Sequence, residues 1–196
     1  MLKLTQDETD LSKNEVDILT GALLLQDKLV SDVMTPLSDC FMLSLEAVLD
    51  FNTICDIRTQ GYSRIPIYDG ERSNIRYILL VKDLLFVHLD DEIPMHEICS
   101  LYCKPFVTAD KDKTLYKLME EFKSGTMGHL AVVKDEDGVS NTGIVTLEDI
   151  IEEILQSEIV DEDDFVTNKS KRKRSKAENP IKQEVEMVLG AFQFDR

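Results

Sequence analysis

Residues 143–150 have the sequence GIVTLEDI, in which a strand pattern changes directly into a helix pattern. The β-branched run ends at Val145, and β-branched residues favour strands. Beyond it, apolar residues recur at the i, i+3, i+4 spacing of one helix face, at Ile150, Ile151, Ile154 and Leu155. The stretch therefore predicts a strand that passes without a loop into an amphipathic helix.

The same order of segments occurs twice along the chain, which indicates an internal repeat. Each copy has a helix, a strand that follows a glycine, a polar turn, a second strand and a second helix. The first copy uses residues 47–57, 62–68, 69–74, 78–81 and 82–85, and the second uses 114–122, 128–133, 134–141, 143–145 and 147–150. The spacing agrees, because Asp83 follows Arg64 by 19 residues and Asp149 follows His129 by 20.

One copy alone is too small to bury both faces of its hairpin, so we expect the two copies to pack sheet against sheet into one body. We predict an α+β fold made of two pseudo-symmetric β-α-β-β-α units, over residues 30–157. The first repeat is expected at residues 30–95 and the second at residues 96–160.

Composition limits the class of protein. The chain has 196 residues, of which 43% are apolar, enough for the core of one domain or a tight pair. Its 22 Lys and Arg against 38 Asp and Glu give a net charge of −16, which argues against binding to nucleic acid. No apolar stretch approaches the roughly 20 residues of a membrane helix. The first residues lack the basic flank and apolar stretch of a secretion signal, which predicts a cytosolic location.

The cysteines and histidines give no sign of a metal site. Cys40, Cys55, Cys99 and Cys103 form no Cys-x-x-Cys pair and lie among apolar neighbours, as buried reduced thiols do. His88, His96 and His129 lack the spacing of metal ligands. The sequence therefore predicts neither a disulfide framework nor a zinc site.

The two ends differ in composition from the middle. Residues 15–29 have apolar positions at helical spacing, so we expect the segment 1–29 to form an amphipathic helix that packs on the repeat pair or on a dimer partner. Residues 1–168 carry 14 bases and 34 acids (14 − 34 = −20), whereas residues 169–176 (KSKRKRSK) have six bases in eight positions. We predict that residues 161–196 form an acidic, then basic, disordered linker and the truncated start of a following domain. A regulatory clasp and a nuclear signal are the alternatives for the basic run.

The second repeat contains the signature Gly-apolar-x-Thr/Ser-x-x-Asp/Asn, as Gly143-Ile144-Val145-Thr146-Leu147-Glu148-Asp149. The pair thus resembles a tandem of cystathionine-β-synthase (CBS) domains, a Bateman module. Longer strings are similar to the cytosolic CBS pair of the cyclin M (CNNM) magnesium-transport family, which is related to bacterial CorC. These strings are residues 33–36 (VMTP), 39–42 (DCFM), 61–66 (GYSRIP), 73–75 (SNI), 81–84 (VKDL) and 145–154 (VTLEDIIEEI).

This resemblance implies a regulatory nucleotide sensor without enzymatic activity. In the family, the CBS pair binds ATP with magnesium and dimerises, a transmembrane domain precedes it, and a cyclic-nucleotide-binding-like domain follows it. We therefore expect a fragment from the cytoplasmic side of a membrane protein, with ATP and Mg²⁺ as its ligands. The sequence also lacks a nucleophile with a histidine base and a Gly-rich phosphate loop, which argues against a hydrolase.

The residue types at the strand-to-helix junction suit a nucleotide. Thr146 supplies a hydroxyl, and Asp149 supplies a carboxylate that can accept both ribose hydroxyls. The resemblance adds Arg64 and nearby hydroxyls for the phosphates, and an apolar pair for the base. These residues are Thr35, Tyr62, Ser63, Arg64, Ile65 and Pro66. Because the chain is acidic, Mg²⁺ is expected to screen the phosphates and to raise the affinity for ATP.

These residues also have ordinary structural explanations. Thr146 and Asp149 can be the N-cap and N3 residues of a capping box, and residues 62–66 can be the start of an edge strand. Glu152 and Glu153 share a helix face with Asp149 and can hold a divalent ion, meet a basic partner, or simply begin a solvated helix.

The first repeat departs from the signature, with Tyr77 at the position of Gly143 and Leu80 at that of Thr146, although Asp83 persists. We expect its symmetry-related pocket to be empty or weak. A second hypothesis is a protein-interaction scaffold, because members of the family bind phosphatases of regenerating liver through an extended loop in the second repeat. Here that loop, residues 134–142, is short, and Asp135 or Asp137 would have to replace the loop-tip aspartate.

Overall fold

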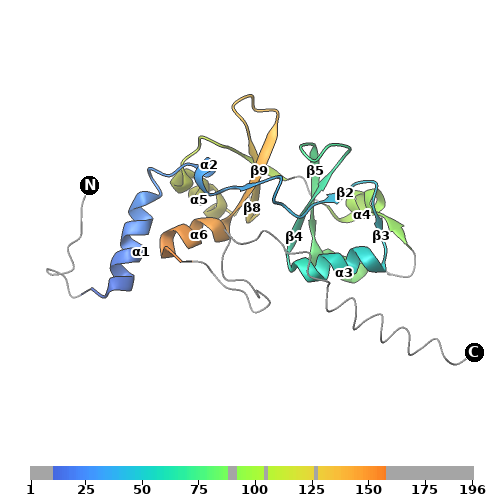
Figure 1. The fold of residues 1–196 in the computed structure, drawn as a ribbon, viewed down its shortest axis with the longest axis horizontal. Helices are drawn as coiled ribbons and strands as arrows, with labels where there is room; N and C mark the ends of the chain where they lie inside the picture. Colours follow the sequence, from blue (N-terminus) through green and yellow to red (C-terminus); the bar gives the residue numbers. More distant parts are fainter. Residues whose placement is uncertain (1–10, 88–91, 104–105, 126–127, 158–196) are drawn as a thin grey trace, which may run out of the picture.

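Two units with the same order of elements follow each other along the chain (Figure 1). The structure is a computed structural model, which describes residues 11–87, 92–103, 106–125 and 128–157. The first unit consists of β2 (Leu43–Ser44), α3 (Phe51–Gln60), β4 (Arg64–Tyr68), β5 (Ile75–Leu80) and the 3₁₀ helix η2 (Val81–Phe86). The second consists of β7 (Val107–Asp110), α5 (Leu115–Lys123), β8 (Leu130–Lys134), β9 (Asn141–Thr146) and α6 (Leu147–Leu155). The predicted α+β pair of β-α-β-β-α units is confirmed, whereas the linker predicted for residues 161–196 lies outside the described residues.

Each unit has its own sheet, and the two sheets share one topology. The strand orders are β2-β4-β5 and β7-β8-β9, with the first two strands parallel and the last two in an antiparallel hairpin. An irregularity repeats as well: the register shifts between Ile67 and Tyr68 in β4, and between Val133 and Lys134 in β8. The repeat found in the sequence is therefore also a repeat of backbone geometry.

One predicted helix boundary is wrong. The segment 47–57 was expected to be helical throughout, but α3 begins only at Phe51, after Asp50 accepts a hydrogen bond from the Thr53 amide at 2.7 Å. The preceding residues form β3 (Val48–Leu49), which pairs antiparallel with β6 (Ile93–Pro94). A pairing between segments so distant in sequence overrides the local helical pattern.

The connecting segments cross between the units. Strand β1 (Thr35–Pro36) extends the second sheet, where it pairs antiparallel with β9, and Pro36 lies opposite Gly143. A Cβ atom on Gly143 would lie 2.7 Å from the Thr35 carbonyl oxygen, so this approach requires glycine. Conversely, α4 (Met95–Tyr102) packs into the core of the first unit. Residues 30–36 thus pack with the second unit, and α4 packs with the first. The limits predicted from sequence, 30–95 and 96–160, assign both segments to the other repeat.

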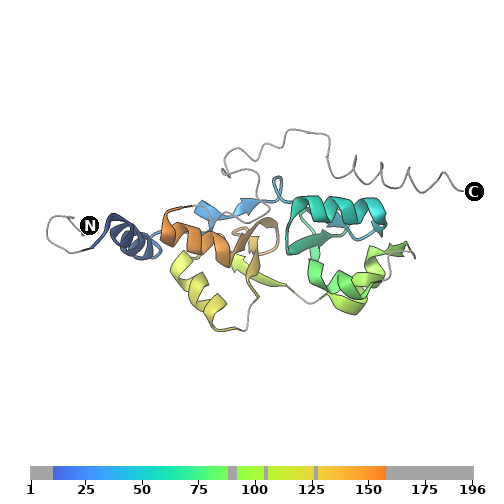
Figure 2. The ribbon, with the colours of Figure 1, turned by 90° about the horizontal axis from the view of Figure 1, so that it is seen from below.

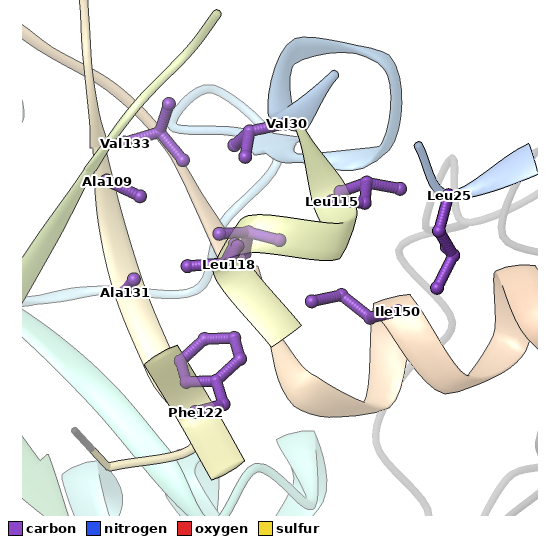
Figure 3. Close-up of a cluster of buried hydrophobic side chains, with 10 residues drawn as sticks. Leu25, Val30, Ala109, Leu115, Leu118, Phe122, Ala131, Val133 and Ile150 are labelled. Atoms are coloured by element: carbon purple, nitrogen blue, oxygen red, sulfur yellow. The ribbon is translucent and has the colours of Figure 1, made fainter. Parts of the chain in front are cut away.

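Three clusters of buried side chains hold the fold together. The core of the second unit places α5 and α6 against the sheet, and it includes Leu25 and Val30, which precede the first unit in sequence (Figure 3). The core of the first unit places α3 and α4 around Ile65, Ile67 and Leu79. The third cluster joins the two sheets, as the predicted sheet-against-sheet packing requires, through Leu37, Cys40, Met42, Ile75 and Val132.

Polar contacts reinforce the junction between the units. Arg72, in the β4–β5 turn, donates hydrogen bonds to the carbonyl oxygens of Leu37 and Cys40 at 2.8 and 2.7 Å. The Asn141 side-chain amide donates to the Ser73 carbonyl oxygen at 2.7 Å. The turn of the first hairpin is thereby tied both to the connecting segment and to the second hairpin.

Helix α1 (Lys13–Leu24) lies beside α6 at the outer side of the second unit (Figure 1). It begins at a capping box in which the Ser12 amide donates to the Glu15 carboxylate at 2.7 Å. The contact with α6 is made at Gly21, where a Cβ atom would lie 2.3 Å from the Ile154 carbonyl oxygen. The helix predicted for the N-terminal segment thus packs on the repeat pair, one of the two surfaces expected for it. None of the helices in the described ranges combines the length and the apolar character that crossing a membrane requires.

Candidate functional site

A hollow of about 490 Å³ opens where α3 ends and β4 begins. It contains three of the predicted residues, Tyr62, Ser63 and Arg64. The remaining walls come from the end of α3 and from the junction between β5 and η2, through Ile57, Arg58, Gly61, Leu80, Val81 and Lys82. We call this the cationic hollow, because its lining includes three cations and no carboxylate.

The local sequence explains this geometry. Gly61 ends α3 in the left-handed conformation, with φ of 70°, and its amide donates to the carbonyl oxygens of Ile57 and Arg58. The chain turns there from the helix into β4. The Val81 amide donates to the Ser63 carbonyl oxygen at 3.0 Å, which fixes the two walls of the hollow relative to each other.

The predicted base-contacting residues lie deeper than the hollow. Ile65 and Pro66 continue β4 and are buried, and Ile65 is part of the first core. A contact of either side chain with an adenine base stays a prediction. The Tyr62 ring, in contrast, lines the hollow and stacks on Phe41, with the ring centroids 6.5 Å apart and an interplanar angle of 23°.

Thr146 and Asp149 form the capping box that the sequence allowed. The Thr146 amide and hydroxyl both donate to Asp149 Oδ2, at 2.7 and 2.8 Å, and the Asp149 amide donates to the Thr146 hydroxyl at 3.2 Å. Asp149 is only 9% exposed, and it is the one buried charged residue in the described part of the chain. These bonds hold the carboxylate in a fixed position at the first turn of α6.

Asp149 also lines a second hollow, of about 360 Å³, between α6 and α2 (Val30–Val33). We call it the acidic hollow, because its lining includes four carboxylates. The lining residues are Asp32, Val33, Asp149, Glu152, Glu153, Gln156 and Ser157. Besides Asp149, which Thr146 binds, two of the carboxylates have partners that can be named: Glu153 forms an ion pair with Lys28, and Asp32 accepts a hydrogen bond from the Leu29 amide at 2.9 Å.

The speculative metal ligands Glu152 and Glu153 therefore lie together with Asp149 on one face of α6, as their spacing predicts. Within the ranges that the structure describes, however, no three His, Cys, Asp or Glu side chains come close enough to hold a metal ion. A direct metal site at these glutamates stays a prediction.

The two hollows share no lining residue: Tyr62, Ser63 and Arg64 line the cationic hollow, and Asp149, Glu152 and Glu153 line the acidic one. Thr35 lies in β1, opposite Ile144, and lines neither. Figures 1 and 2 show α3 and α6 on the same side of the molecule, with the end of α3 and the beginning of α6 directed toward its middle. Both predicted clusters thus lie on one side, one in each unit.

The pKa of the buried Cys40 thiol depends on burial and on nearby charges. Burial raises the pKa of Cys40 to about 12, the nearby Arg72 opposes this, and the charges of Asp39 and Asp149 add to it. All four cysteines are free thiols, as predicted, and three of them are buried.

Sequence reasoning missed two cations of the cationic hollow. Arg58 lies in the last turn of α3, and Lys82 lies in the first turn of η2. Both are exposed, charged residues of an ordinary kind in their segments. They line one hollow only because the chain returns along β4 and β5 to the end of α3. Phe41, the stacking partner of Tyr62, was missed for the same reason.

Comparison with known proteins places this geometry in a family. The family model of the CBS domain matches residues 98–156. The metal transporter cnnm-1 of Caenorhabditis elegans is 40% identical over 189 residues, which is 91% of this chain and 23% of that protein. The CBS domain of the bacterial CNNM/CorC family Mg²⁺ transporter in complex with ATP has a TM-score of 0.64 and 29% identity, covering 74% of this chain and 99% of that one. The chain belongs to the CNNM/CorC family.

A more distant neighbour agrees in fold. A CBS-domain pair with bound AMP from Klebsiella pneumoniae has a TM-score of 0.53 and 23% identity, covering 65% of this chain and 98% of that one. The CNNM/CorC module described here therefore has the fold of CBS pairs that bind adenine nucleotides. The family predicted from the sequence is confirmed, and these matches indicate no enzyme family. The chain spans less than a quarter of the length of the C. elegans transporter.

Proposed function

We propose that this CNNM/CorC module is a sensor of adenine nucleotides that binds ATP together with Mg²⁺. The single observation that carries the proposal is the combination of the cationic hollow with the fixed Thr146–Asp149 pair on the same side of the molecule. A volume of about 490 Å³ is within the range of small-molecule sites. The similar CBS domain that was solved in complex with ATP supports the choice of nucleotide.

The cationic hollow is the proposed phosphate site. Arg64 can hold a phosphate through two parallel N–H donors, and the hydroxyls of Tyr62 and Ser63 can add neutral hydrogen bonds. The hollow has no carboxylate in its lining that would repel an anion. The Tyr62 ring, supported by Phe41, offers the adenine base an aromatic face next to these donors.

The ribose is proposed to bind at Asp149. A carboxylate accepts hydrogen bonds from two hydroxyls at once, and the capping bonds from Thr146 orient it in advance. The nucleotide would then extend from the first turn of α6 toward the end of α3. Because the ribose and the phosphates contact different units, binding would favour one arrangement of the units over others.

Magnesium is proposed to enter with the phosphates. The chain carries a net charge of −16, and this field opposes the approach of a triphosphate. Mg²⁺ binds nucleotide phosphates while it keeps several of its waters, so it needs few or no ligands from the protein. The cation would neutralise part of the phosphate charge, while Arg64 and its neighbours position what remains.

The proposal extends to the protein from which the chain comes. We place the module on the cytoplasmic side of a membrane protein that transports magnesium or another divalent metal, or that regulates such transport, and we expect two copies of the pair to associate. The name of the C. elegans relative, a metal transporter, supports this assignment. Helix α1 packs on α6 and is thus suited to pass changes at Asp149 to the segment that precedes it. The comparisons do not favour the scaffold hypothesis.

Isothermal calorimetry tests the proposal. We expect ATP with Mg²⁺ to bind at about one site per chain, and EDTA to weaken the binding. Asp149→Ala should lower the affinity at least about tenfold, because it removes two charge-assisted hydrogen bonds. Asp83→Ala is the matched control, since Asp83 has the equivalent position in the first unit, where Leu80 provides no side-chain cap.

Two further measurements keep the test decisive. Asp149→Asn retains an acceptor for the cap, so its thermal unfolding should resemble that of the unsubstituted chain while its affinity for ATP falls. If no adenine nucleotide binds under any condition, the sensor proposal is overturned, and Thr146 and Asp149 are a helix cap alone. Binding of ATP that EDTA leaves unchanged would contradict the role of magnesium.

A further inference from the structure

The end of α4 carries two cysteines one helical turn apart, away from both hollows. Cys99 is only 2% exposed and belongs to the core of the first unit, and Cys103, which follows the last residue of the helix, packs against the same core. The Cys103 amide donates to the Cys99 carbonyl oxygen at 3.1 Å. This bond holds the two residues at the i, i+4 spacing, at which side chains on a helix are neighbours.

The two thiols also interact directly, through a hydrogen bond between their side chains. This hydrogen bond lowers the pKa of Cys99, against the effect of burial. It raises the pKa of Cys103, and burial and the charges of Cys99 and Asp83 act in the same direction. The pair therefore stabilises one thiolate, and the thiol beside it keeps its proton.

The remaining two cysteines have surroundings of a different kind. The Cys40 thiol donates to the Pro36 carbonyl oxygen at 3.2 Å, and burial raises its pKa to about 12, so it stays protonated. Cys55 is buried in α3. Of the four cysteines, Cys103 is the one that is not buried. Reactivity toward a dissolved reagent is therefore expected at the pair on α4, because a thiol must both ionise and be reached in order to react.

We infer that Cys99 and Cys103 are a redox-active dithiol, which a small-molecule disulfide such as glutathione disulfide converts into a disulfide bond across the last turn of α4. Cys103 passes its proton to the Cys99 thiolate and attacks one sulfur of the oxidant, whose S–S bond breaks to release one glutathione thiolate. Cys99 then gives up this proton and attacks the Cys103 sulfur, and the second glutathione leaves as a thiol. The two thiols are oxidised, and the oxidant is reduced to two molecules of glutathione.

Equilibration of the full chain with mixtures of reduced and oxidised glutathione tests this inference, independently of any nucleotide. Mass spectrometry after an acid quench and proteolysis measures how much of the peptide with both cysteines has lost two hydrogen atoms. We expect the effective concentration of the two thiols to be at least about tenfold higher in the folded chain than in the chain unfolded in urea, because a disulfide that fits the fold restricts mainly the unfolded chain. An effective concentration that is equal or lower in the folded chain would overturn the inference.

Two variants separate the roles of the cysteines. Cys99→Ala removes the second nucleophile, so Cys103 should retain one glutathione as a mixed disulfide, which the unsubstituted chain should not accumulate. Cys103→Ala leaves only the buried Cys99, and glutathione should react with it at least about tenfold more slowly than with Cys103 in Cys99→Ala. Cys55→Ala is the matched control, because it removes a buried helical cysteine outside the pair and should leave oxidation of the pair unchanged.

The outcomes that contradict the dithiol are equally specific. A stable mixed disulfide at Cys103 in the unsubstituted chain would show that Cys99 does not reach it. Oxidation that joins Cys40 or Cys55 to another cysteine in the folded chain would place the reactive pair elsewhere. The experiment on the unsubstituted chain needs no substitution in the core, so it decides the inference even where Cys99→Ala fails to fold.

Discussion

The cationic and the acidic hollow include equivalent junctions of the two repeats, and the junctions differ in one capping residue. In the second repeat, Thr146 caps a nine-residue α-helix and fixes Asp149 with three hydrogen bonds. In the first repeat, Leu80 has that position, provides no side-chain cap, and is followed by a six-residue 3₁₀ helix. The comparison teaches that a single hydroxyl at the N-cap decides whether the following aspartate is held in place.

The two junctions also differ in the charge of the residues that follow them. The first turn of α6 carries Glu148 and Asp149, which the N-terminal end of a helix dipole stabilises. At the uncapped junction, Lys82 replaces the first of these acids, and it lines the cationic hollow together with Arg58 and Arg64. The hollow at one junction is thus lined by cations, whereas the hollow beside the other is lined by carboxylates, one of which the cap holds in place.

The largest expected effect comes from loosening the better anchored junction. Ile150 is fully buried under α6, so Ile150→Ala should lower the free energy of unfolding by about 2 to 5 kcal/mol. The control in the first repeat is Leu85→Ala, since Leu85 is 84% exposed on η2 and its loss should cost less than about 0.5 kcal/mol. Urea denaturation measures the free energy of unfolding of both variants. Equal losses would contradict the conclusion that α6 is held more firmly than η2.

The contact between α1 and α6 gives the next largest effect. In an exposed helix, replacing Gly by Ala stabilises by about 1 kcal/mol. At Gly21 we expect the opposite sign, because the new Cβ would lie 2.3 Å from the Ile154 carbonyl oxygen, and overpacking costs about 1 to 3 kcal/mol. Thermal unfolding measures the change. Ala22→Val, at the exposed neighbouring position, should remain close to the unsubstituted chain, and a stabilising Gly21→Ala would show that the two helices do not touch here.

Removing the cap makes the two junctions more alike. Thr146→Val keeps the shape of the side chain and removes its hydroxyl, so the free energy of unfolding should fall by about 1 kcal/mol. The affinity for ATP should also fall, because Asp149 loses the group that orients it. Asp50→Ala removes the cap of α3 at a similar cost, but it leaves Asp149 untouched. If both variants bind ATP equally well, the cap of α6 has no part in binding.

The smallest effect is expected at the β8–β9 turn, at the far end of that hairpin from α6 (Figure 1). Hydrogen bonds from the Ser140 hydroxyl and from the amides of Ser140 and Val139 lower the pKa of Asp137 to about 2. Because the folded-state pKa is below the ordinary value of about 3.8, the carboxylate stabilises the turn above that pH, and the contribution is lost as the pH falls through about 2. NMR of the Val139 and Ser140 amides should show this step, and Asp137→Asn should remove it. A step near pH 4 would contradict the hydrogen bonds.

The repeat itself was predictable from sequence because its signals are local. The predicted helix at 114–122 agrees with α5, and the strand that runs into a helix at 143–150 agrees with β9 and α6. The start of α3 was predictable as well: Asp50 is a typical N-cap residue, and giving it more weight than the apolar spacing of Ala47 and Val48 would have placed the boundary correctly.

The rest depends on contacts that no local pattern contains. Arg58 and Lys82 are 24 positions apart (82 − 58 = 24) and meet only because the chain returns along β4 and β5. The resemblance names residues but does not give the distances between them, so it did not indicate that Arg64 and Asp149 line separate hollows. The contact of Ile65 with a base stays a prediction, and no local pattern indicated that its side chain is also part of the first core.

Strand β1 has a consequence for the order of events during synthesis. Residues 35 and 36 leave the ribosome early, yet their partners in β9 are residues 144 and 143. The three strands of the first sheet can assemble as soon as residue 80 has emerged. The segment before them must wait, unpaired, for more than 60 further residues (144 − 80 = 64). Closure of the second sheet by β1 is therefore among the last steps of cotranslational folding.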